Sequence, residues 1–230
     1  MFLLDSEEIA FPDPALYDFE GGLLAMGGDL SPERIWFAYQ NGIFPWFNPE
    51  DEILWWCPNP RFVLFPNELK ISKSMKKIIR DGKFRITENV CFREVMKNCG
   101  EISRKEQDGT WITDEMVNSY TQLHKYGKAK SVEVWEGDEL VGGLYGVDLG
   151  NVFCGESMFS KVSNASKAGF IWFVEKYKAK FQIIDCQVYT EHLESLGARE
   201  ISKLELVNRF LSTKKFISLY TVTSSPFHLS

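Results

Sequence analysis

Cysteine and histidine are scarce in this 230-residue sequence, and neither occurs in the spacing of a known site. The five cysteines form no CxxC pair, and an odd number of them in a chain without a visible signal peptide indicates free thiols in a reducing cytosol. The three histidines do not have metal-ligand spacing. The longest apolar runs, such as 168–174, are too short for a transmembrane helix. We therefore expect a cytoplasmic protein with no membrane span, no disulfides and no metal site.

Several common catalytic motifs are also missing. The segment Gly155–Phe159 fails the GxSxG pattern at its last position, and the chain has neither GxGxxG nor a Walker-type phosphate loop. These absences argue against hydride transfer, nucleotide hydrolysis and metal-dependent hydrolysis.

What the chain does contain is apolar and aromatic surface. Hydrophobic residues make up 44% of it, with 18 Phe, 8 Tyr and 7 Trp, so most of the length can bury a core and is not disordered. The length fits one large domain or a main domain with a smaller appendage. The net charge of −6 argues against a protein that coats nucleic acid over its whole surface.

The distribution of glycine and proline residues divides the chain into two parts. Residues 1–60 are rich in turn motifs, and one helix there is marked by Ser31 as N-cap, Pro32 at its first position and Gly42 after its end. We predict a small, loop-rich N-terminal domain over 1–60 that packs on a larger domain over 61–230.

From residue 61 the pattern alternates between strands and helices, which predicts an α/β (α+β) fold. Strands are predicted at 61–65, 84–87, 131–135, 139–147, 151–159 and 181–189. Helices are predicted at 70–81, 89–99, after the N-cap Thr113, and at 164–178.

One segment is strongly basic within this acidic chain. Between Lys70 and Arg85 there are seven Lys or Arg residues and one acid, Asp81. Helical spacing places Lys73, Lys76, Lys77 and Arg80 on one side and Ile71, Met75, Ile78 and Ile79 on the other. The pattern fits either a solvated face of an amphipathic helix or a surface that contacts nucleic-acid phosphates.

Polar residues interrupt two of the apolar strands. Strand alternation predicts that Asp185, Gln187 and Tyr189 share one face, and Glu156 lies inside another apolar strand. If the two strands are neighbours, two carboxylates share a pocket that attracts a cation such as the basic N-terminal residue of a peptide. The alternatives are a structural hydrogen-bonded pair for Asp185 and Gln187, and an edge strand on which Glu156 faces water.

Tryptophans stand in turn-like segments, at Trp46, Trp55, Trp56 and Trp111. Such side chains either stack on nucleotide bases or belong to the core.

Ten segments, in order along residues 9 to 210, together resemble the leucyl/phenylalanyl-tRNA–protein transferase family. They are residues 22–34, 42–48, 54–61, 109–113, 131–135, 140–147, 153–160, 164–167, 184–188 and 195–198. Blocks of this length are far more specific than a three-residue motif.

The resemblance implies an enzyme that moves Leu or Phe, and less readily Met, from aminoacyl-tRNA to the N-terminal Arg or Lys of a protein. The product carries a residue that marks it for degradation by the N-end rule. The implied fold is a small N-terminal domain plus a larger GNAT-like acyltransferase domain. The implied enzyme is a cytoplasmic monomer that needs no cofactor, because the aminoacyl ester already stores the energy.

The resemblance also assigns residues. The catalytic positions are Asp185, Gln187 and Glu156. Trp46 and Trp111 match aromatics that hold the terminal adenosine, while Leu144, Phe153, Met158 and Phe173 match the amino-acid side-chain pocket. Lys73, Lys77 and Arg80 match basic positions that face the acceptor stem of the tRNA. Relatives often have Met where this chain has Leu144.

Two other functions remain to be compared with this one. An acetyl-CoA-dependent acetyltransferase needs a glycine-rich turn at a helix start, and residues 160–167 contain no glycine. A non-catalytic RNA-binding module would bind tRNA in a salt-dependent manner without turnover.

Overall fold

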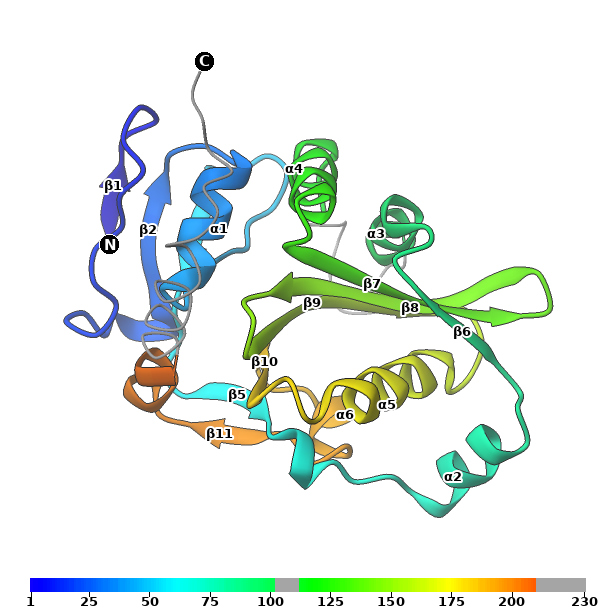
Figure 1. Cartoon of the computed structure of the whole chain (residues 1–230). Helices are drawn as coiled ribbons and strands as arrows, with labels where there is room; N and C mark the ends of the chain where they lie inside the picture. The colour runs from blue at the N-terminus through cyan, green and yellow to red at the C-terminus, as the bar shows by residue number, and fades with distance from the viewer. Residues whose placement is uncertain (102–111, 210–230) are drawn as a thin grey trace, which may run out of the picture.

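The computed structural model describes residues 1–101 and 112–209, which form two β-sheets (Figure 1). Within these residues the smaller sheet has four strands in the order β1-β2-β4-β3. They are β1 (Phe2–Leu4), β2 (Leu23–Gly27), β3 (Phe44–Pro45) and β4 (Leu54–Trp56). The N-terminal part therefore combines the expected turns with a small sheet that the sequence pattern did not reveal.

The larger sheet has seven strands within the described ranges, in the order β11-β5-β10-β9-β8-β7-β6. They are β5 (Arg61–Leu64), β6 (Arg85–Glu88), β7 (Ala129–Glu136), β8 (Glu139–Asp148), β9 (Val152–Ser160), β10 (Ile183–Gln187) and β11 (Arg199–Ile201). Only β9 and β10 pair in parallel; the other pairs of this sheet, over the same described residues, are antiparallel. The expected α/β class, with a small N-terminal part and a larger one, is confirmed.

Helices cover both faces of the larger sheet. The helices of the described residues are α1 (Pro32–Gln40), α2 (Lys73–Arg80), α3 (Phe92–Glu101), α4 (Asp114–Lys125), α5 (Ala165–Tyr177) and α6 (Glu191–Glu194). Of these, α3, α4 and α5 pack on the larger sheet, whereas α1 contacts β3 and α4. In Figure 1, α3 and α4 lie on one face and α5 on the other, with α2 beyond α5. Short 3-10 turns occur at Glu20–Gly22 and Pro66–Glu68. Every helix in the described part of the chain is too short or too polar to cross a bilayer.

Two predicted helix starts are confirmed by their hydrogen bonds. The Ser31 hydroxyl accepts from the backbone N–H of Arg34, with Pro32 at the first helical position. The Thr113 hydroxyl accepts from the backbone N–H of Met116. In both cases the side chain satisfies one of the N–H groups that have no partner within the helix.

Helix α5 packs closely on the sheet because Gly169 has no side chain. A Cβ at this position would lie 2.7 Å from a methyl carbon of Val134 on β7. The apolar residues of α5 include the fully buried Phe173 and Val174, which fill the space between helix and sheet. The position of α5 relative to the sheet is therefore fixed by this packing.

The predicted strand at 181–189 is wrong at its end. β10 stops at Gln187, whose φ of 64° is left-handed, and the register with β5 shifts between Asp185 and Gln187. The simple alternation that places Asp185, Gln187 and Tyr189 on one face is therefore lost. Tyr189 lies outside the strand and is exposed.

The predicted basic helix is also shorter than expected, since α2 begins after the N-cap Ser72. Met75 is buried and Ile78 partly so, as predicted, but Ile79 is 45% exposed and does not belong to the apolar face. The proposed domain boundary at residue 60 falls between β4 of the small sheet and β5 of the large one and stays a prediction.

Candidate active site

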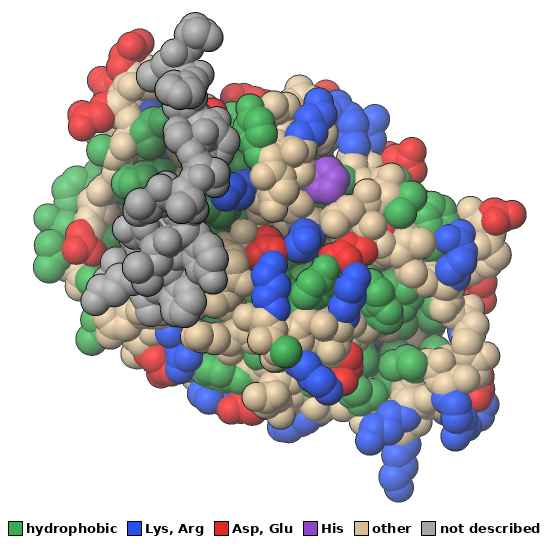
Figure 2. Space-filling view, in the orientation of Figure 1, with side chains coloured by type: hydrophobic (Ala, Val, Ile, Leu, Met, Phe, Trp, Pro, Cys, Tyr) green, Lys and Arg blue, Asp and Glu red, His purple; other side chains and the backbone are tan. Residues whose placement is uncertain are grey.

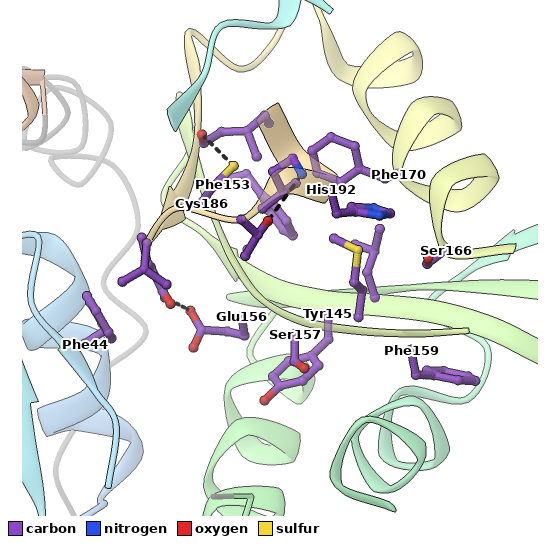
Figure 3. Close-up of a pocket in the computed structure, with 18 of the residues that line it drawn as sticks. Phe44, Tyr145, Phe153, Glu156, Ser157, Phe159, Ser166, Phe170, Cys186 and His192 are labelled. Carbon is purple, nitrogen blue, oxygen red and sulfur yellow. Dashed lines mark hydrogen bonds between the residues drawn. The ribbon is translucent and has the colours of Figure 1, made fainter. Parts of the chain in front are cut away.

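β9 and β10 run side by side only as far as the pair Asp185 and Cys154, and then separate. A cavity of about 470 Å³ opens where they part (Figure 3). Its walls come from both sheets, from α5 and from the segment after β10. Its lining includes Phe44, Pro45, Trp46, Leu144, Tyr145, Phe153, Gly155, Glu156, Met158, Phe170, Ile184, Cys186, Gln187, His192 and Leu193. Ligands of α/β proteins bind at such openings beyond the ends of parallel strands.

The interior of this cavity is mainly apolar. Three of the four predicted side-chain pocket residues line it: Leu144, Phe153 and Met158. Phe173 does not reach the cavity; it is fully buried one layer behind, with its ring centroid 4.4 Å from that of Phe153. The structure also places Phe170 in the wall, a residue that the sequence analysis missed because a helical Phe is typical of any core.

Hydrogen bonds connect the three predicted catalytic residues at the polar edge of the cavity. Gln187 Nε2 donates to Glu156 Oε1 over 2.8 Å, as the dashed line in Figure 3 shows. The backbone N–H of Gln187 donates to Asp185 Oδ1 over 3.0 Å. Gln187 and Glu156 line the cavity, whereas Asp185 is fully buried beneath Gln187 and does not. The expectation that two carboxylates share the cavity is therefore wrong: β9 and β10 are neighbours, but Asp185 turns toward β5.

Asp185 is held there by an arginine that the sequence analysis did not select. Arg61 Nε and Nη2 donate to the two carboxylate oxygens of Asp185 over 2.8 and 2.7 Å. The sequence did contain a feature that could have pointed to Arg61, because it is a charged residue at the start of an apolar strand. A charged side chain in that position is costly to bury unless an oppositely charged partner binds it.

Burial raises the pKa of Glu156 to about 8, with the negative charge of Asp185 adding to the effect. Tyr39, Arg61 and Gln187 oppose the shift because each favours the ionised carboxylate. The site therefore holds a carboxyl that changes its charge near neutral pH. Perturbed groups of this kind, facing a cavity, are characteristic of active sites.

Two tyrosines, also not selected from the sequence, lie behind Glu156. The hydroxyls of Tyr39 on α1 and Tyr120 on α4 are 2.6 Å apart, and both side chains are fully buried. Burial raises the pKa of each phenol well above its usual value, with the charge of Glu156 contributing. Both phenols therefore stay neutral and can act only through hydrogen bonds.

The predicted adenosine-binding tryptophans have different outcomes. Trp46 follows β3 of the small sheet, lines the cavity and packs on Trp56, with ring centroids 5.8 Å apart. Trp111 lies outside the described residues. The N-terminal part of the chain thus supplies one side of the cavity mouth through Phe44, Pro45 and Trp46.

The predicted tRNA-contacting residues lie on α2, away from the cavity. Lys73, Lys77 and Arg80 are exposed, and Figure 2 shows Lys and Arg side chains (blue) gathered over this helix. Lys77 forms an ion pair with Asp81, and Arg80 approaches the same carboxylate at 3.5 Å. Asp81 therefore offsets part of the charge of this surface, while Lys73 has no ion-pair partner among residues 1–101 and 112–209.

Comparison with known families decides which enzyme class this site belongs to. A family model described as leucyl/phenylalanyl-tRNA protein transferase matches residues 63–211, and its N-terminal domain model matches residues 28–59. The chain belongs to the leucyl/phenylalanyl-tRNA protein transferase family. The expected family and enzyme class, an aminoacyl-tRNA–protein transferase, are therefore confirmed.

Relatives of the same family cover most of the chain. A leucyl/phenylalanyl-tRNA–protein transferase from Flavobacterium johnsoniae is 57% identical over 88% of this chain and 95% of its own length. Those of Christiangramia forsetii and Hydrogenovibrio crunogenus are 53% and 55% identical over 90% and 88% of this chain, and 98% and 80% of their own lengths. Membership in this family favours the transferase over both other functions weighed from the sequence.

A solved GCN5-related N-acetyltransferase from Anabaena variabilis is 10% identical, covers 77% of this chain and 43% of its own, and has a TM-score of 0.39. This structural similarity is too weak to show that the two folds are the same. The GNAT-like description of the larger part therefore rests on the sequence resemblance and stays a prediction.

Proposed function

We propose that this protein transfers Leu or Phe, and less readily Met, from aminoacyl-tRNA to the N-terminal Arg or Lys of acceptor proteins, which marks them for degradation by the N-end rule. The observation that carries the proposal is an apolar cavity that ends at a carboxyl–amide pair, Glu156 and Gln187. An aminoacyl side chain and an incoming amine need this combination of surfaces side by side.

The apolar walls bind the side chain of the amino acid. Leu144, Phe153 and Met158 offer aliphatic, aromatic and thioether surface, which suits Leu, Phe and Met and excludes polar side chains. Trp46 at the mouth can stack on the terminal adenine of the tRNA, as we propose also for Trp111. The ester carbonyl then lies near the polar edge.

The reaction at that edge is an aminolysis. The neutral α-amine attacks the ester carbonyl, an amide bond forms, and the bond to the ribose oxygen breaks. One proton leaves the amine and one proton reaches the ribose oxygen, so no external reactant is needed. Free α-amines have a pKa of about 8, close to that of Glu156, which makes Glu156 a suitable proton acceptor.

Gln187 and Asp185 have different roles in this proposal. The Gln187 amide group donates to Glu156, and its oxygen can accept from the incoming amine. Asp185 acts through Gln187 as a positioning residue, because it holds the backbone N–H of Gln187 and does not reach the cavity. The aminoacyl ester supplies the energy, so we propose that no cofactor takes part.

Lys73, Lys77 and Arg80 contact tRNA phosphates in this proposal, and the chain works as a cytoplasmic monomer with domains at 1–60 and 61–230. Exposed cations on one helix of an acidic chain support a localised tRNA contact. No group of three or more potential metal ligands occurs among residues 1–101 and 112–209.

The direct test mixes the protein with radiolabelled Phe-tRNA and a peptide that begins with Arg, and counts label in the peptide. The same peptide with an acetylated N-terminus is the control, since it lacks the nucleophile but keeps every side chain. Label in the free peptide alone supports the proposal. Label in both peptides, or in neither, contradicts it.

A further inference from the structure

Arg61, the partner of Asp185, is a fully buried cation that has no part in the proposed transfer reaction as it stands. It is the first residue of β5, a strand in which all four side chains are buried, and it is 1% exposed. Burying a guanidinium is costly unless hydrogen bonds and an opposite charge compensate it.

The contacts of Arg61 join two walls of the site. Its fork donates to both oxygens of Asp185 over 2.8 and 2.7 Å. Its guanidinium carbon lies 4.6 Å from the ring centroid of Phe44, which lines the cavity from the N-terminal part of the chain (Figure 3). One planar group thus fixes both a ring at the cavity mouth and the carboxylate beneath the polar edge.

From Asp185 a continuous series of hydrogen bonds reaches the reacting carboxyl. Asp185 Oδ1 accepts from both Arg61 Nε and the backbone N–H of Gln187. Gln187 has a φ of 64°, a left-handed conformation that is unfavourable for a residue with a side chain and needs support from its surroundings. That conformation directs the Gln187 side chain to Glu156.

We propose that Arg61 is a positioning residue of the transfer reaction, which holds Asp185 and Phe44 so that Gln187 faces Glu156 and which offsets the charge of Asp185 near Glu156. This inference rests on the proposed function and adds a residue to it. Arg61 does not touch the cavity, so it acts only through its neighbours.

The electrostatic part of the proposal follows from the groups around Glu156. Within residues 1–101 and 112–209 these are Tyr39 on α1, Tyr120 on α4, Cys154 on β9, Asp185 on β10 and Arg61 on β5. The two phenols and the buried thiol have pKa values raised well above their usual ranges and are neutral. Asp185 and Arg61 are therefore the charges that matter, and they oppose each other: Asp185 raises the pKa of Glu156 and Arg61 lowers it.

Three variants separate position from charge. Arg61→Met removes the cation and leaves Asp185 uncompensated, so we expect the pH midpoint of kcat to move upward by about one unit and kcat to fall about tenfold or more. Arg61→Lys keeps the charge without the fork, so the midpoint stays near that of the wild type while kcat falls. The double variant Arg61→Met with Asp185→Asn removes both charges. We therefore expect its pH midpoint to be close to that of the wild type, while its kcat stays low. In all three, KM for Phe-tRNA changes less than about twofold, because neither Arg61 nor Asp185 lines the cavity and every residue that does is kept.

Arg199→Met is the matched control. Arg199 also donates in a fork to a carboxylate, that of Glu68, and lies 4.4 Å from the centroid of Phe65. It is half exposed on β11, the edge strand three positions from the strand β9 that carries Glu156, and its carboxylate partner makes no hydrogen bond to Gln187, so kcat and its pH midpoint should not change.

The outcomes distinguish this inference from the proposed function. If the wild type transfers no label, the proposed function fails. If the wild type is active and the Arg61 variants keep its kcat and midpoint, Arg61 is structural only and the inference is overturned. If Arg61→Met does not fold, Arg61→Lys decides: a lowered kcat at unchanged KM supports the inference, and an unchanged kcat contradicts it.

Discussion

The hydroxyl of Tyr39 lies 2.6 Å from the hydroxyl of Tyr120, and this contact joins α1 of the N-terminal part to α4 of the larger part behind the active-site carboxyl Glu156. Both rings are fully buried and pack edge to face with centroids 6.4 Å apart. A hydrogen bond in this position affects both stability and the charge of Glu156.

Replacing Tyr39 with Phe should destabilise the protein by about 1–2 kcal/mol, because the hydroxyl of Tyr120 loses its partner in a dry environment. It should also move the pH midpoint of transfer upward, because Tyr39 favours the ionised form of Glu156. Denaturant unfolding and a pH–rate profile measure the two effects.

The double variant Tyr39→Phe with Tyr120→Phe should be destabilised by less than the sum of the two single variants, because each single variant already breaks the same hydrogen bond. Strict additivity would show that the two hydroxyls do not interact.

Glu156→Gln should abolish most transfer and yet stabilise the protein at alkaline pH. The pKa of Glu156 is about 8 when folded and near the ordinary value of 4.5 when unfolded, so the folded state binds more protons between these values. Stability of the wild type therefore falls as pH rises through this window. The Gln variant lacks this loss and should be more stable than the wild type by on the order of 1–3 kcal/mol at pH 9.

The comparison is made by urea unfolding of both proteins at pH 5 and pH 9, with the difference between them expected to grow with pH. A difference that stays constant with pH would mean that the pKa of Glu156 is not raised.

Leu144→Ala should change the choice between amino acids. Leu144 is buried in the cavity wall, and its truncation enlarges the space for the aminoacyl side chain. The ratio of kcat/KM for Phe over Leu should rise, because the smaller substrate forfeits about 1–3 kcal/mol of binding energy for each methylene-sized gap that it leaves unfilled. Phe173→Leu is the control, since Phe173 lies behind Phe153 and should change thermal stability without changing this ratio. An unchanged ratio in Leu144→Ala would place the side chain elsewhere.

Lys73→Ala should weaken tRNA binding more than Lys77→Ala does. Both side chains are exposed on α2, but Lys77 is paired with Asp81 and its charge is partly offset. The slope of log affinity against log salt should fall by roughly 0.7–0.9 for each phosphate that the variant no longer neutralises. Filter binding at several salt concentrations measures this. If both variants and the wild type have the same slope of log affinity against log salt, α2 does not contact the tRNA and is a solvated amphipathic helix.

Much of the fold follows from local pattern. The N-caps Ser31 and Thr113 were predictable because a hydroxyl before an apolar period has a known local function. The bend at Gln187 was not, because it depends on the carboxylate of Asp185 and the partner strand β5, which are not visible in a two-residue alternation. The strands of the small sheet were also missed, since they are short and lie among turns.

The site residues that interrupt an apolar strand with a polar side chain could be predicted from the sequence. Those that depend on contacts between residues far apart in the chain could not. Glu156 and Gln187 stand out as polar residues in apolar segments, and the structure brings them within hydrogen-bonding distance. Arg61 is 124 positions from Asp185, and Tyr39 is 81 positions from Tyr120. Only the folded chain shows these pairs, since many arginines and tyrosines in the sequence have the same local context.

The central claim is that the amino acid occupies the cavity beside Glu156 and Gln187, and a crystal structure with a stable analogue tests it most directly. In phenylalanyl-adenosine with an amide in place of the ester, the N–H stands in for the ester oxygen and prevents transfer. We expect the phenyl ring against Leu144, Phe153 and Met158, with the carbonyl group at the Gln187 edge. A phenyl ring bound outside this cavity would contradict the account.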